Sequence, residues 1–519
     1  PVPDCVADES DVFTGPFDAW DELPFRTPWR MFILGRSPGE LLENNHLVPN
    51  LNHPCALEDT SWIHPGKAMR EVTLSTGGAR KLTDFAAEQN IRYIHFDSGW
   101  SGPEWRREND PTVIPDEKFK KYEDGDLMRT DLSDRLHDEI SYARKHGRGV
   151  IVYVNHEQLE YQNLAELFAT YADWGIDGVK FGFVRTGPQV WTIWLHYAVR
   201  KAAEHGLVVN VHDRYVPTGF WRTYPNFLTM EGVRGDEQNP LPEEDLTTLF
   251  TRCLVGPTDH TLCYYSDWLK KTHAYQLAAA AVFFSPLQYT YWYDTPAEFD
   301  GDPALDFWKH VSTTWDRTVV LNGAIGEYAT VARRKGSQWY VGTLTDENGR
   351  ALKVPLDFLA DDRDYVAEIY TDAPGADPRE YPVPVTVERV LVNSQDTLAA
   401  PVPPTGGHAV RLYPADDAEG ENLPAYRRPR IQVSELSVPN NIEAGEECGV
   451  AVTCANTGNT VGGVMIKLRV DGTATLSRLV RVEPGGKRTI RLPCTISDAG
   501  KHTIEVNGKT IEVLVTSNA

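Results

Sequence analysis

The stretch GVKFGF, residues 178–183, has the continuous apolar composition of a β-strand that is buried on both faces. It follows WGID at 174–177 and precedes VWTIWLHYAVRKAAEHG at 190–206, which has the pattern of a helix. The strand ends at Gly182, where a parallel strand would normally deliver a side chain to a site. A strand aimed at a site but ending without a side chain raises the question of what acts there instead.

Similar strand–helix units repeat between about residues 60 and 290. The other strand segments are equally rich in Val, Ile, Tyr and Phe: IRYIHFD (91–97), RGVIVYVNHE (148–157) and LVVNVHD (207–213). Three helical segments end in glycine, in KHG, DWG and EHG, which is a common signal for a helix C-terminus. We predict an α/β fold with a (β/α)8 TIM barrel. A doubly wound open sheet is the alternative, but no glycine-rich dinucleotide loop follows the first strands.

Beyond the barrel the sequence changes to short alternating strands separated by turn residues. This pattern predicts two antiparallel β-domains joined by an acidic segment that contains Pro and Gly. The predicted domains are an N-terminal arm with one or two strands (1–58), the barrel (59–312), a C-terminal β-sandwich domain (313–416), a linker (417–430) and an immunoglobulin-like β-sandwich (431–519).

The chain of 519 residues carries a formal net charge of −23. Such an acidic surface repels nucleic acids and anionic membranes and favours neutral or cationic small ligands. A solvated surface that keeps the protein soluble and moderate halophily would both give this balance. No apolar run approaches the roughly 18 residues of a membrane helix, and no signal-peptide pattern is present in this chain.

Seven cysteines lie far apart, without the CxxC spacing of a zinc ribbon or a thioredoxin motif. Their odd number implies at least one free thiol. Cys448, Cys454 and Cys494 fall in one short β-rich region, where one local disulfide is plausible. The cysteine pattern favours an extracytoplasmic location.

Carboxylates stand at the predicted C-terminal ends of several strands: Asp97, Glu157, Asp213, Glu231 and Glu237. Many aromatic residues accompany them, namely Trp100, Trp105, Trp191, Trp194, Trp221 and Tyr224. Paired carboxylates can perform acid and base work on a glycosidic bond, and aromatic rings can stack on sugars. A carbohydrate site is therefore predicted, against the alternative of solvated carboxylates and aromatic residues that pack in the core.

His156 and His212 each precede an acidic residue at a strand end. They could join a metal site or orient their neighbours through hydrogen bonds, and the spacing lacks the HExxH pattern of a zinc site. An oxygen-ligand site for Ca²⁺ from Asp213, Glu231 and Glu237 is more natural.

Residues 27–375 resemble glycoside hydrolase family 97, a family of α-glucosidases and α-galactosidases. The resemblance rests on long motifs: DTSWIHPGK (59–67), YIHFDSGW (93–100), PTGFWRTYPNFLTMEGVRGDE (217–237) and FTRCLVGPTDHT (250–261). Retaining members of the family carry an aspartate nucleophile at the end of the fourth strand, where inverting members carry glycine. This chain has Gly182 there, and it therefore resembles the inverting α-glucosidase branch, with a vacant nucleophile position at Gly182.

The resemblance implies Glu237 as general acid, with Glu157 and Asp213 as bases that activate water. Asp213 replaces a glutamate of the family and is one methylene shorter. In inverting relatives calcium is bound at positions matching Asp213, Glu231 and Glu237, so Ca²⁺ is the implied cofactor. Seven residues are predicted to contact the substrate: Asp97, Trp100, His156, Lys180, His212, Arg222 and Arg234.

Two further features follow from the resemblance. Residues 1–58 look like the remnant of the family's N-terminal β-sandwich, and residues 431–519 resemble CARDB-type adhesion domains. The latter implies a spacer or a module that contacts the cell surface or another protein, and an extracellular or periplasmic location.

The sequence thus predicts an inverting, calcium-assisted glycoside hydrolase that acts on α-glucosides at the non-reducing end. Hydrolysis of another α-glycoside, such as an α-galactoside or an arabinoside, and a non-catalytic carbohydrate-binding barrel are the alternatives. The predicted partner is an oligosaccharide or glycoside, with no nucleic acid and no membrane span.

Overall fold

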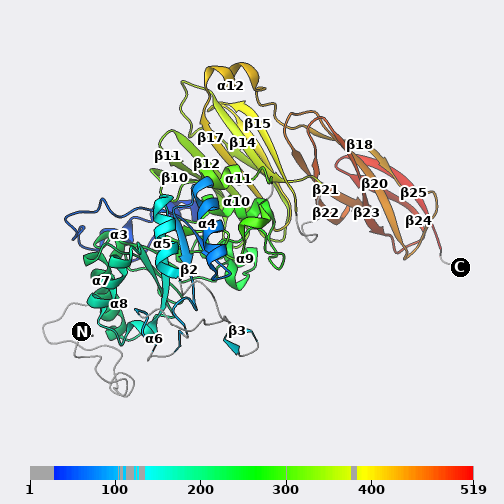
Figure 1. Ribbon diagram of the computed structural model, residues 1–519. Coiled ribbons are helices and arrows are strands. Elements are labelled where there is room, and N and C mark those ends of the chain that lie inside the picture. Colours follow the sequence, from blue (N-terminus) through cyan, green and yellow to red (C-terminus); the bar gives the residue numbers. More distant parts are fainter. Residues whose placement is uncertain are drawn as a thin grey trace. The chain divides into compact units, whose positions relative to one another are not determined.

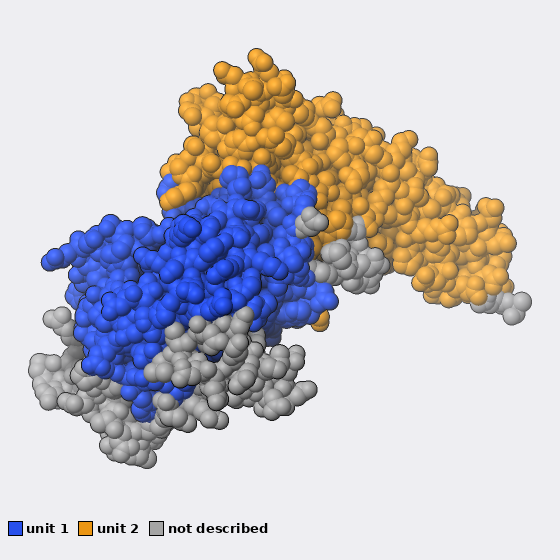
Figure 2. Space-filling view, in the orientation of Figure 1, with its two compact units in different colours: residues 1–269, 280–320 blue, residues 270–279, 321–519 orange. Residues whose placement is uncertain are grey.

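The computed structural model describes residues 29–102, 104–105, 109–112, 122–123, 126–127, 135–299, 301–375 and 383–517. The chain divides into two compact units, one of residues 1–269 and 280–320, the other of residues 270–279 and 321–519 (Figure 2). Among the described residues, no helix combines the length and apolar character needed to cross a membrane.

The first unit contains a sheet of seven parallel strands in the order β8-β7-β6-β5-β2-β1-β9. The strands are β1 (Gly66–Glu71), β2 (Tyr93–Phe96), β5 (Gly149–Asn155), β6 (Gly178–Gly182), β7 (Val208–Val211), β8 (Phe227–Met230) and β9 (Leu287–Tyr289). Helices lie outside this sheet (Figure 1): α4 (Thr76–Glu88), α5 (Leu136–Lys145), α7 (Leu164–Trp174), α8 (Gln189–Glu204), α9 (Pro242–Leu249) and α11 (Leu305–His310). The helix α10 (His273–Val282) is divided between the two units at residue 280. The predicted TIM barrel is confirmed.

The gap between β8 and β9 is bridged by residues 258–263, here called the closing segment. Asp259 N donates to Met230 O on one side over 2.9 Å. On the other side Leu262 N donates to Tyr289 O over 3.2 Å, and Trp292 N donates to Leu262 O over 3.0 Å. An irregular segment therefore takes the place of the eighth strand.

Glycines end the barrel helices as the sequence predicts. Gly147, Gly175 and Gly206 have φ angles of 69°, 83° and 70°, a left-handed conformation that residues with a side chain rarely adopt.

The barrel interior is apolar at one end and polar at the other. Strand register aligns Ala68 with Tyr93 and Gly178 with Val208, and these residues form or adjoin the apolar layer. Two residues further along each strand the inner face becomes charged or polar, as at Lys180, because side chains alternate along a strand. The polar layer lies toward the C-terminal ends of the strands, where barrels carry their sites.

Residues 29–58 contain the short helices α2 (Pro38–Glu43) and α3 (Leu47–Asn50). The predicted strand of this arm does not occur in 29–58, and the rest of the arm lies outside the described residues. Ser37 accepts a hydrogen bond from Glu40 N at the start of α2, and Pro38 occupies the first helical turn. This cap and the proline favour a helix start over a strand.

The second unit begins with antiparallel sheets in the order β10-β11-β12-β17-β14-β15 and β13-β16. Their strands are β10 (Arg317–Ala324), β11 (Tyr328–Lys335), β12 (Gln338–Thr345), β13 (Arg350–Pro355), β14 (Tyr365–Asp372), β15 (Val385–Val392), β16 (Thr397–Val402) and β17 (Gly407–Pro414). Residues 270–279 group with this unit, unlike in the predicted domain division. Asp372 explains the grouping, since its carboxylate accepts hydrogen bonds from Thr272 Oγ1 (2.9 Å) and Ala274 N (3.3 Å).

The predicted linker contains a helix, α12 (Asp417–Asn422). Asp416 caps it by accepting from Glu419 N over 2.8 Å, and the Glu419 side chain accepts in turn from Asp416 N. This reciprocal pair is a capping box, which explains why the acidic segment is helical.

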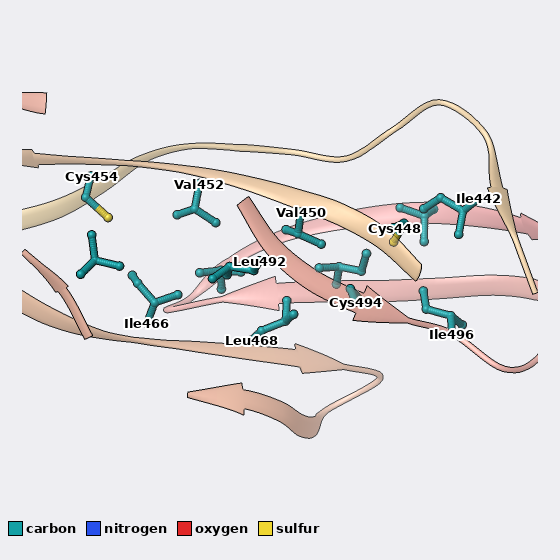
Figure 3. Packing of buried hydrophobic residues seen from close by; sticks show 14 of the residues in the cluster. Ile442, Cys448, Val450, Val452, Cys454, Ile466, Leu468, Leu492, Cys494 and Ile496 are labelled. Carbon is teal, nitrogen blue, oxygen red and sulfur yellow. The ribbon is translucent and has the colours of Figure 1, made fainter. Parts of the chain in front are cut away.

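The C-terminal β-sandwich packs a three-stranded sheet, β18-β20-β23, against a five-stranded sheet, β19-β25-β24-β21-β22. The strands are β18 (Ile431–Ser437), β19 (Ile442–Glu443), β20 (Glu447–Asn456), β21 (Gly462–Val470), β22 (Thr473–Val482), β23 (Lys487–Thr495), β24 (Gly500–Val506) and β25 (Lys509–Thr516). Aliphatic side chains from both sheets fill the core, with Cys448, Cys454 and Cys494 among them (Figure 3).

The three cysteines of this core are free thiols. Cys448 and Cys494 are directly opposite each other in the β20–β23 ladder, whereas Cys454 is opposite Arg488. Opposed residues of an antiparallel pair have the Cα separation that a disulfide requires.

We therefore predict that mild oxidation joins Cys448 to Cys494 and leaves Cys454 reduced. Closing this loop should stabilise the sandwich by about 2–4 kcal/mol, because the unfolded chain loses conformational freedom. Peptide mass spectrometry under non-reducing conditions identifies the bond, and urea unfolding measures the gain. Cys494→Ser should abolish both effects and Cys454→Ser neither; a bond to Cys454 would contradict the prediction.

Candidate active site

Asp97 lies in the polar layer of the barrel, directly after β2, and is 6% exposed. Its carboxylate contacts Arg70 Nε at 3.0 Å, His95 Nε2 at 3.2 Å and Lys180 Nζ at 3.5 Å. Burial alone would raise the pKa of Asp97, but the charges of Lys180 and Arg70 outweigh it and hold the pKa well below its usual range. Asp97 is therefore a fixed negative charge at the centre of the barrel and no proton donor.

The cation of Lys180 also lies 4.0 Å from the ring centroid of Trp292. Arg70 stacks on the same ring at 4.9 Å. Aromatic faces of this kind stabilise cations that burial has removed from water. Asp97, Arg70 and Lys180 together form a rigid charged floor beneath the mouth of the barrel.

His212 follows β7 and is held between two carboxylates. Its Nε2 lies 2.7 Å from Asp259 Oδ2, and its Nδ1 lies 3.5 Å from Glu231 Oε2. Burial and the charge of Lys180 oppose protonation of His212, but Glu231 and Asp259 outweigh them and raise its pKa. Asp259 comes from the closing segment and was missed by the sequence prediction, since that segment has no strand pattern.

The ligand atoms of His212, Glu231 and Glu237 lie within 4.8 Å of one another, so these residues could hold a metal ion. The predicted calcium ligands were Asp213, Glu231 and Glu237. The structure thus gathers the two glutamates but offers His212 in place of Asp213. The two carboxylates suit Ca²⁺, whereas an imidazole is more usual for transition metals. A carboxylate behind the histidine, here Asp259, is a common way to fix the orientation of such a ligand.

Asp213 turns toward the end of β6 instead. Its Oδ2 accepts a short hydrogen bond from the backbone N–H of Phe183. Asp213 and Phe183 both have positive φ angles, 69° and 53°. Such conformations are strained for residues other than glycine and persist where surrounding contacts impose them, often at functional sites.

Glu237 lies in the short 3-10 helix Asp236–Gln238 and is partly exposed. Its Oε1 accepts a hydrogen bond from Tyr293 Oη over 3.4 Å, and its backbone N donates to Thr261 Oγ1 over 3.2 Å. Burial and the nearby Glu237 charge raise the pKa of Tyr293 to about 12, so the phenol stays protonated.

Glu157 is the second residue of helix α6 (His156–Leu159) at the end of β5, where Asn155 caps the helix by accepting from Glu157 N over 3.0 Å. The Glu157 carboxylate lies 3.5 Å from Arg185 Nη2 and 3.8 Å from His156 Nε2. Arg185 and His156 thus fix the position of the Glu157 carboxylate at the end of β5.

Gly182 has no free space at its Cα. A Cβ built there would lie well under 3.0 Å from the ring and the hydroxyl of Tyr153, a residue of β5. The predicted vacancy of a nucleophile is therefore filled by a phenol.

The remaining predicted substrate-binding residues separate into three groups. Trp100 is 2% exposed, and its indole N–H donates to Tyr153 O over 2.6 Å, so it packs in the core. Arg222 donates to Pro49 O and to Asn50 Oδ1, and Arg234 pairs with Glu244 at 2.8 Å. His156 Nδ1 lies 3.1 Å from Glu160 Oε1 next to Glu157, where it can orient that carboxylate.

Two residues near the site were not among the seven predicted substrate contacts, although Trp105 was among the aromatic residues of the predicted carbohydrate site. Glu104 is largely buried near Asp97, and burial raises its pKa to about 6. Trp105 is 52% exposed and lies 4.5 Å from the ring of Phe183, itself 45% exposed. This exposed aromatic pair is a surface on which a sugar could stack; Trp191 and Trp194, by contrast, are buried.

Comparison with known proteins gives matches to two family models. Residues 62–233 match the model described as glycoside hydrolase 97, and residues 314–413 match the one described as glycosyl-hydrolase 97 C-terminal, oligomerisation. The first match ends just before Glu237.

Similar proteins are known among characterised enzymes and solved structures. A protein named retaining alpha-galactosidase from Bacteroides thetaiotaomicron is 29% identical over 427 residues, which cover 75% of this chain. The chain spans 60% of the length of that relative. A glycoside hydrolase family 97 enzyme from Pseudoalteromonas sp. strain K8, solved in complex with acarbose, is 28% identical with a TM-score of 0.63 and covers 74% of this chain and 65% of its own. A variant of that enzyme solved in complex with panose is also 28% identical, has a TM-score of 0.62 and covers the same shares of the two chains.

We predict that Asp97→Asn destabilises the protein by about 3–5 kcal/mol at pH 7, because it leaves Arg70 and Lys180 buried without a counter-charge. The pKa of Asp97 is lower in the folded state, so its stabilisation is complete above about pH 4. It is lost as the pH falls toward the folded pKa, and the difference between wild type and variant should shrink there. Urea unfolding as a function of pH measures this.

The control is Asp306→Asn, which removes an exposed carboxylate 3.7 Å from His310. It should cost less than about 1 kcal/mol. Equal effects of the two substitutions at pH 7 would contradict the role assigned to Asp97.

Proposed function

The chain belongs to glycoside hydrolase family 97, and we propose that it hydrolyses α-glucosidic bonds at the non-reducing end with inversion at the anomeric carbon. The observation that carries the proposal is the end of β6, where Gly182 has no side chain and Tyr153 occupies its place. A retaining enzyme needs a nucleophile about 5–5.5 Å from its acid, whereas an inverting enzyme needs room for a water between its carboxyls.

In this proposal Glu237 is the general acid. It protonates the glycosidic oxygen as the bond to the anomeric carbon breaks, and the hydrogen bond from Tyr293 Oη orients its carboxyl. Glu157 and Asp213 are the bases: one of them takes a proton from the water that attacks the anomeric carbon from the opposite face. Arg185 holds the Glu157 carboxylate in place, and the Phe183 N–H fixes Asp213 while leaving its Oδ1 for the water.

The related proteins favour more than one candidate for the sugar in the substrate of this chain. The Pseudoalteromonas enzyme was solved with acarbose and with panose, which favours an α-glucoside. The Bacteroides relative is named a retaining alpha-galactosidase, which makes an α-galactoside the second candidate substrate. Retention, however, would require a nucleophile that the end of β6 does not supply.

We also propose that Ca²⁺ binds Glu231 and Glu237, with His212 beside them. A bound divalent cation would neutralise part of the charge of Glu231 and would contact one oxygen of Glu237, leaving the other oxygen to carry the proton that Glu237 donates. No step of the proposed reaction depends on it.

The C-terminal sandwich is proposed to be a spacer or a surface-contact module of an extracellular or periplasmic protein. Both candidate metal clusters found among the described residues lie in the barrel, which supports a non-catalytic role for the sandwich.

Glu237→Gln should lower kcat on unactivated α-glucosides by about 10²–10⁴-fold, because the leaving oxygen is no longer protonated. The loss should be smaller on aryl α-glucosides with good leaving groups, which need little protonation. Steady-state kinetics on maltose and on 4-nitrophenyl α-glucoside measures both.

The matched control is Glu243→Gln, the same change at an exposed position of α9, which should leave kcat unchanged. Equal rates for wild type and Glu237→Gln on maltose would contradict the assignment. NMR of the first product should detect the β-anomer, and an α-anomer would overturn inversion. The same kinetic measurements on aryl α-galactosides decide whether the substrate is an α-glucoside or an α-galactoside.

Calcium at 100 times its Kd should stabilise the barrel by about 2.7 kcal/mol, raising Tm by a few degrees. Differential scanning calorimetry with and without a chelator measures the shift. Glu231→Gln should abolish it, and Zn²⁺ in place of Ca²⁺ tests the contribution of His212. A Tm that is insensitive to calcium would contradict the calcium proposal.

A further inference from the structure

The barrel interior pairs small residues with bulky ones from the next strand. A side chain at Gly149 would collide with Tyr93, and one at Gly178 with Val208, in the same way that one at Gly182 would collide with Tyr153. Inward-facing positions of a small barrel are commonly filled in this way. Tyr153 differs from the other two bulky residues because it brings a hydroxyl to the C-terminal end of the barrel.

Tyr153 is only 5% exposed, and its position is well fixed. The indole N–H of Trp100 donates to its backbone carbonyl, and Lys180 lies 5.7 Å from the centroid of its ring. Its Oη accepts a hydrogen bond from Asn155 Nδ2 over 3.4 Å. A phenol is neutral at physiological pH, so Tyr153 keeps a hydroxyl hydrogen that it can donate.

The hydroxyl of Tyr153 has negative neighbours. Burial raises the pKa of Tyr153, and the charges of Glu104, Asp97 and Asp213 act in the same direction. Asp213 approaches from β7, where its Oδ2 accepts from the Phe183 N–H directly after Gly182. The end of β6 is thus flanked by a donor from β5 and a carboxylate from β7.

We propose that Tyr153 is a positioning residue that holds the attacking water at the end of β6, beside the place of a residue-182 side chain that its own ring fills. The inference rests on the proposed function, since it assigns a partner to the water of that reaction. It also explains why the nucleophile is a water here: the tyrosine leaves no room for a carboxylate on β6.

The reaction balances without a further reactant. Tyr153 Oη–H donates to one lone pair of the water, and the other lone pair attacks the anomeric carbon. One water proton passes to Asp213, while the glycosidic C–O bond breaks and the leaving oxygen takes its proton from Glu237. Tyr153 is unchanged at the end, which is why it positions the water without itself reacting.

Tyr153→Phe keeps the ring and removes only the hydroxyl. We expect kcat to fall about 10–100-fold with little change in KM, because the group acts on the water and does not bind the sugar. The fall should be similar for maltose and for 4-nitrophenyl α-glucoside, unlike the fall for Glu237→Gln. Tyr142→Phe is the matched control: it removes a hydroxyl that donates to Asp84 on the outer helices (2.8 Å) and should leave kcat unchanged.

A second measurement tests, without any assay of activity, whether the Tyr153 ring excludes a side chain at residue 182. Gly182→Ala should lower Tm by roughly 4 °C or more in the wild type, because its Cβ meets the tyrosine ring. The same substitution should cost much less in a Tyr153→Ala background, where the ring is gone. Equal Tm losses in the two backgrounds would overturn the inference.

The two hypotheses fail in different ways. A wild type that inverts its substrate, alongside a Tyr153→Phe variant with unchanged kcat, would overturn the role of Tyr153 and leave the proposed function standing. A wild type that hydrolyses none of the aryl glycosides would overturn the proposed function and the positioning role together. The Tm coupling between residues 153 and 182 would still be expected in that case.

Discussion

The buried ion cluster around Asp97 is the constraint on which the site depends. Arg70, His95 and Lys180 come from three different strands. The low dielectric of the barrel interior would make the charges of Arg70 and Lys180 prohibitive without a counter-ion, whereas burial lowers the pKa of His95 to about 4 and keeps that imidazole neutral. The carboxylate fixes the inward direction of these side chains. The aromatic layer of Trp292 and Tyr293 then packs against Arg70, and Tyr293 in turn contacts Glu237. A charge balance at the floor of the barrel is thereby connected to the proposed acid at its mouth.

Periodicity was sufficient to predict the elements that carry the site. Continuous apolar strands, glycines at the ends of helices and carboxylates after the strands all follow from local rules, and Asp97, Glu157, Asp213 and Glu231 lie where those rules put them. The direction of a side chain at a strand end does not follow from local rules. Asp213 turns to Phe183 through a left-handed backbone conformation that only the folded rim imposes.

Other features depend on contacts between residues that are distant in the sequence. The alternation of side chains along β5 can predict that Tyr153 faces the barrel interior. Its place beside Gly182, however, depends on the pairing of β5 with β6. The choice of Cys494 as the partner of Cys448 depends in the same way on the β20–β23 register. The helix α12, in contrast, could have been predicted from the sequence, because Asp416 and Glu419 have the spacing of a capping box. The acidic composition of the segment favoured a linker instead.

The closing segment gives the barrel a weak point with a defined location. A regular strand is held by a ladder of hydrogen bonds on both sides, whereas residues 258–263 are held by a few isolated ones. Residues 258–263 are nevertheless buried, and most of their amides are hydrogen-bonded, so amide hydrogen exchange there should be faster than in the paired strands but slower than in exposed loops of the barrel. The segment also carries Asp259, the partner of His212. An opening of this segment would therefore also separate Asp259 from the imidazole of His212.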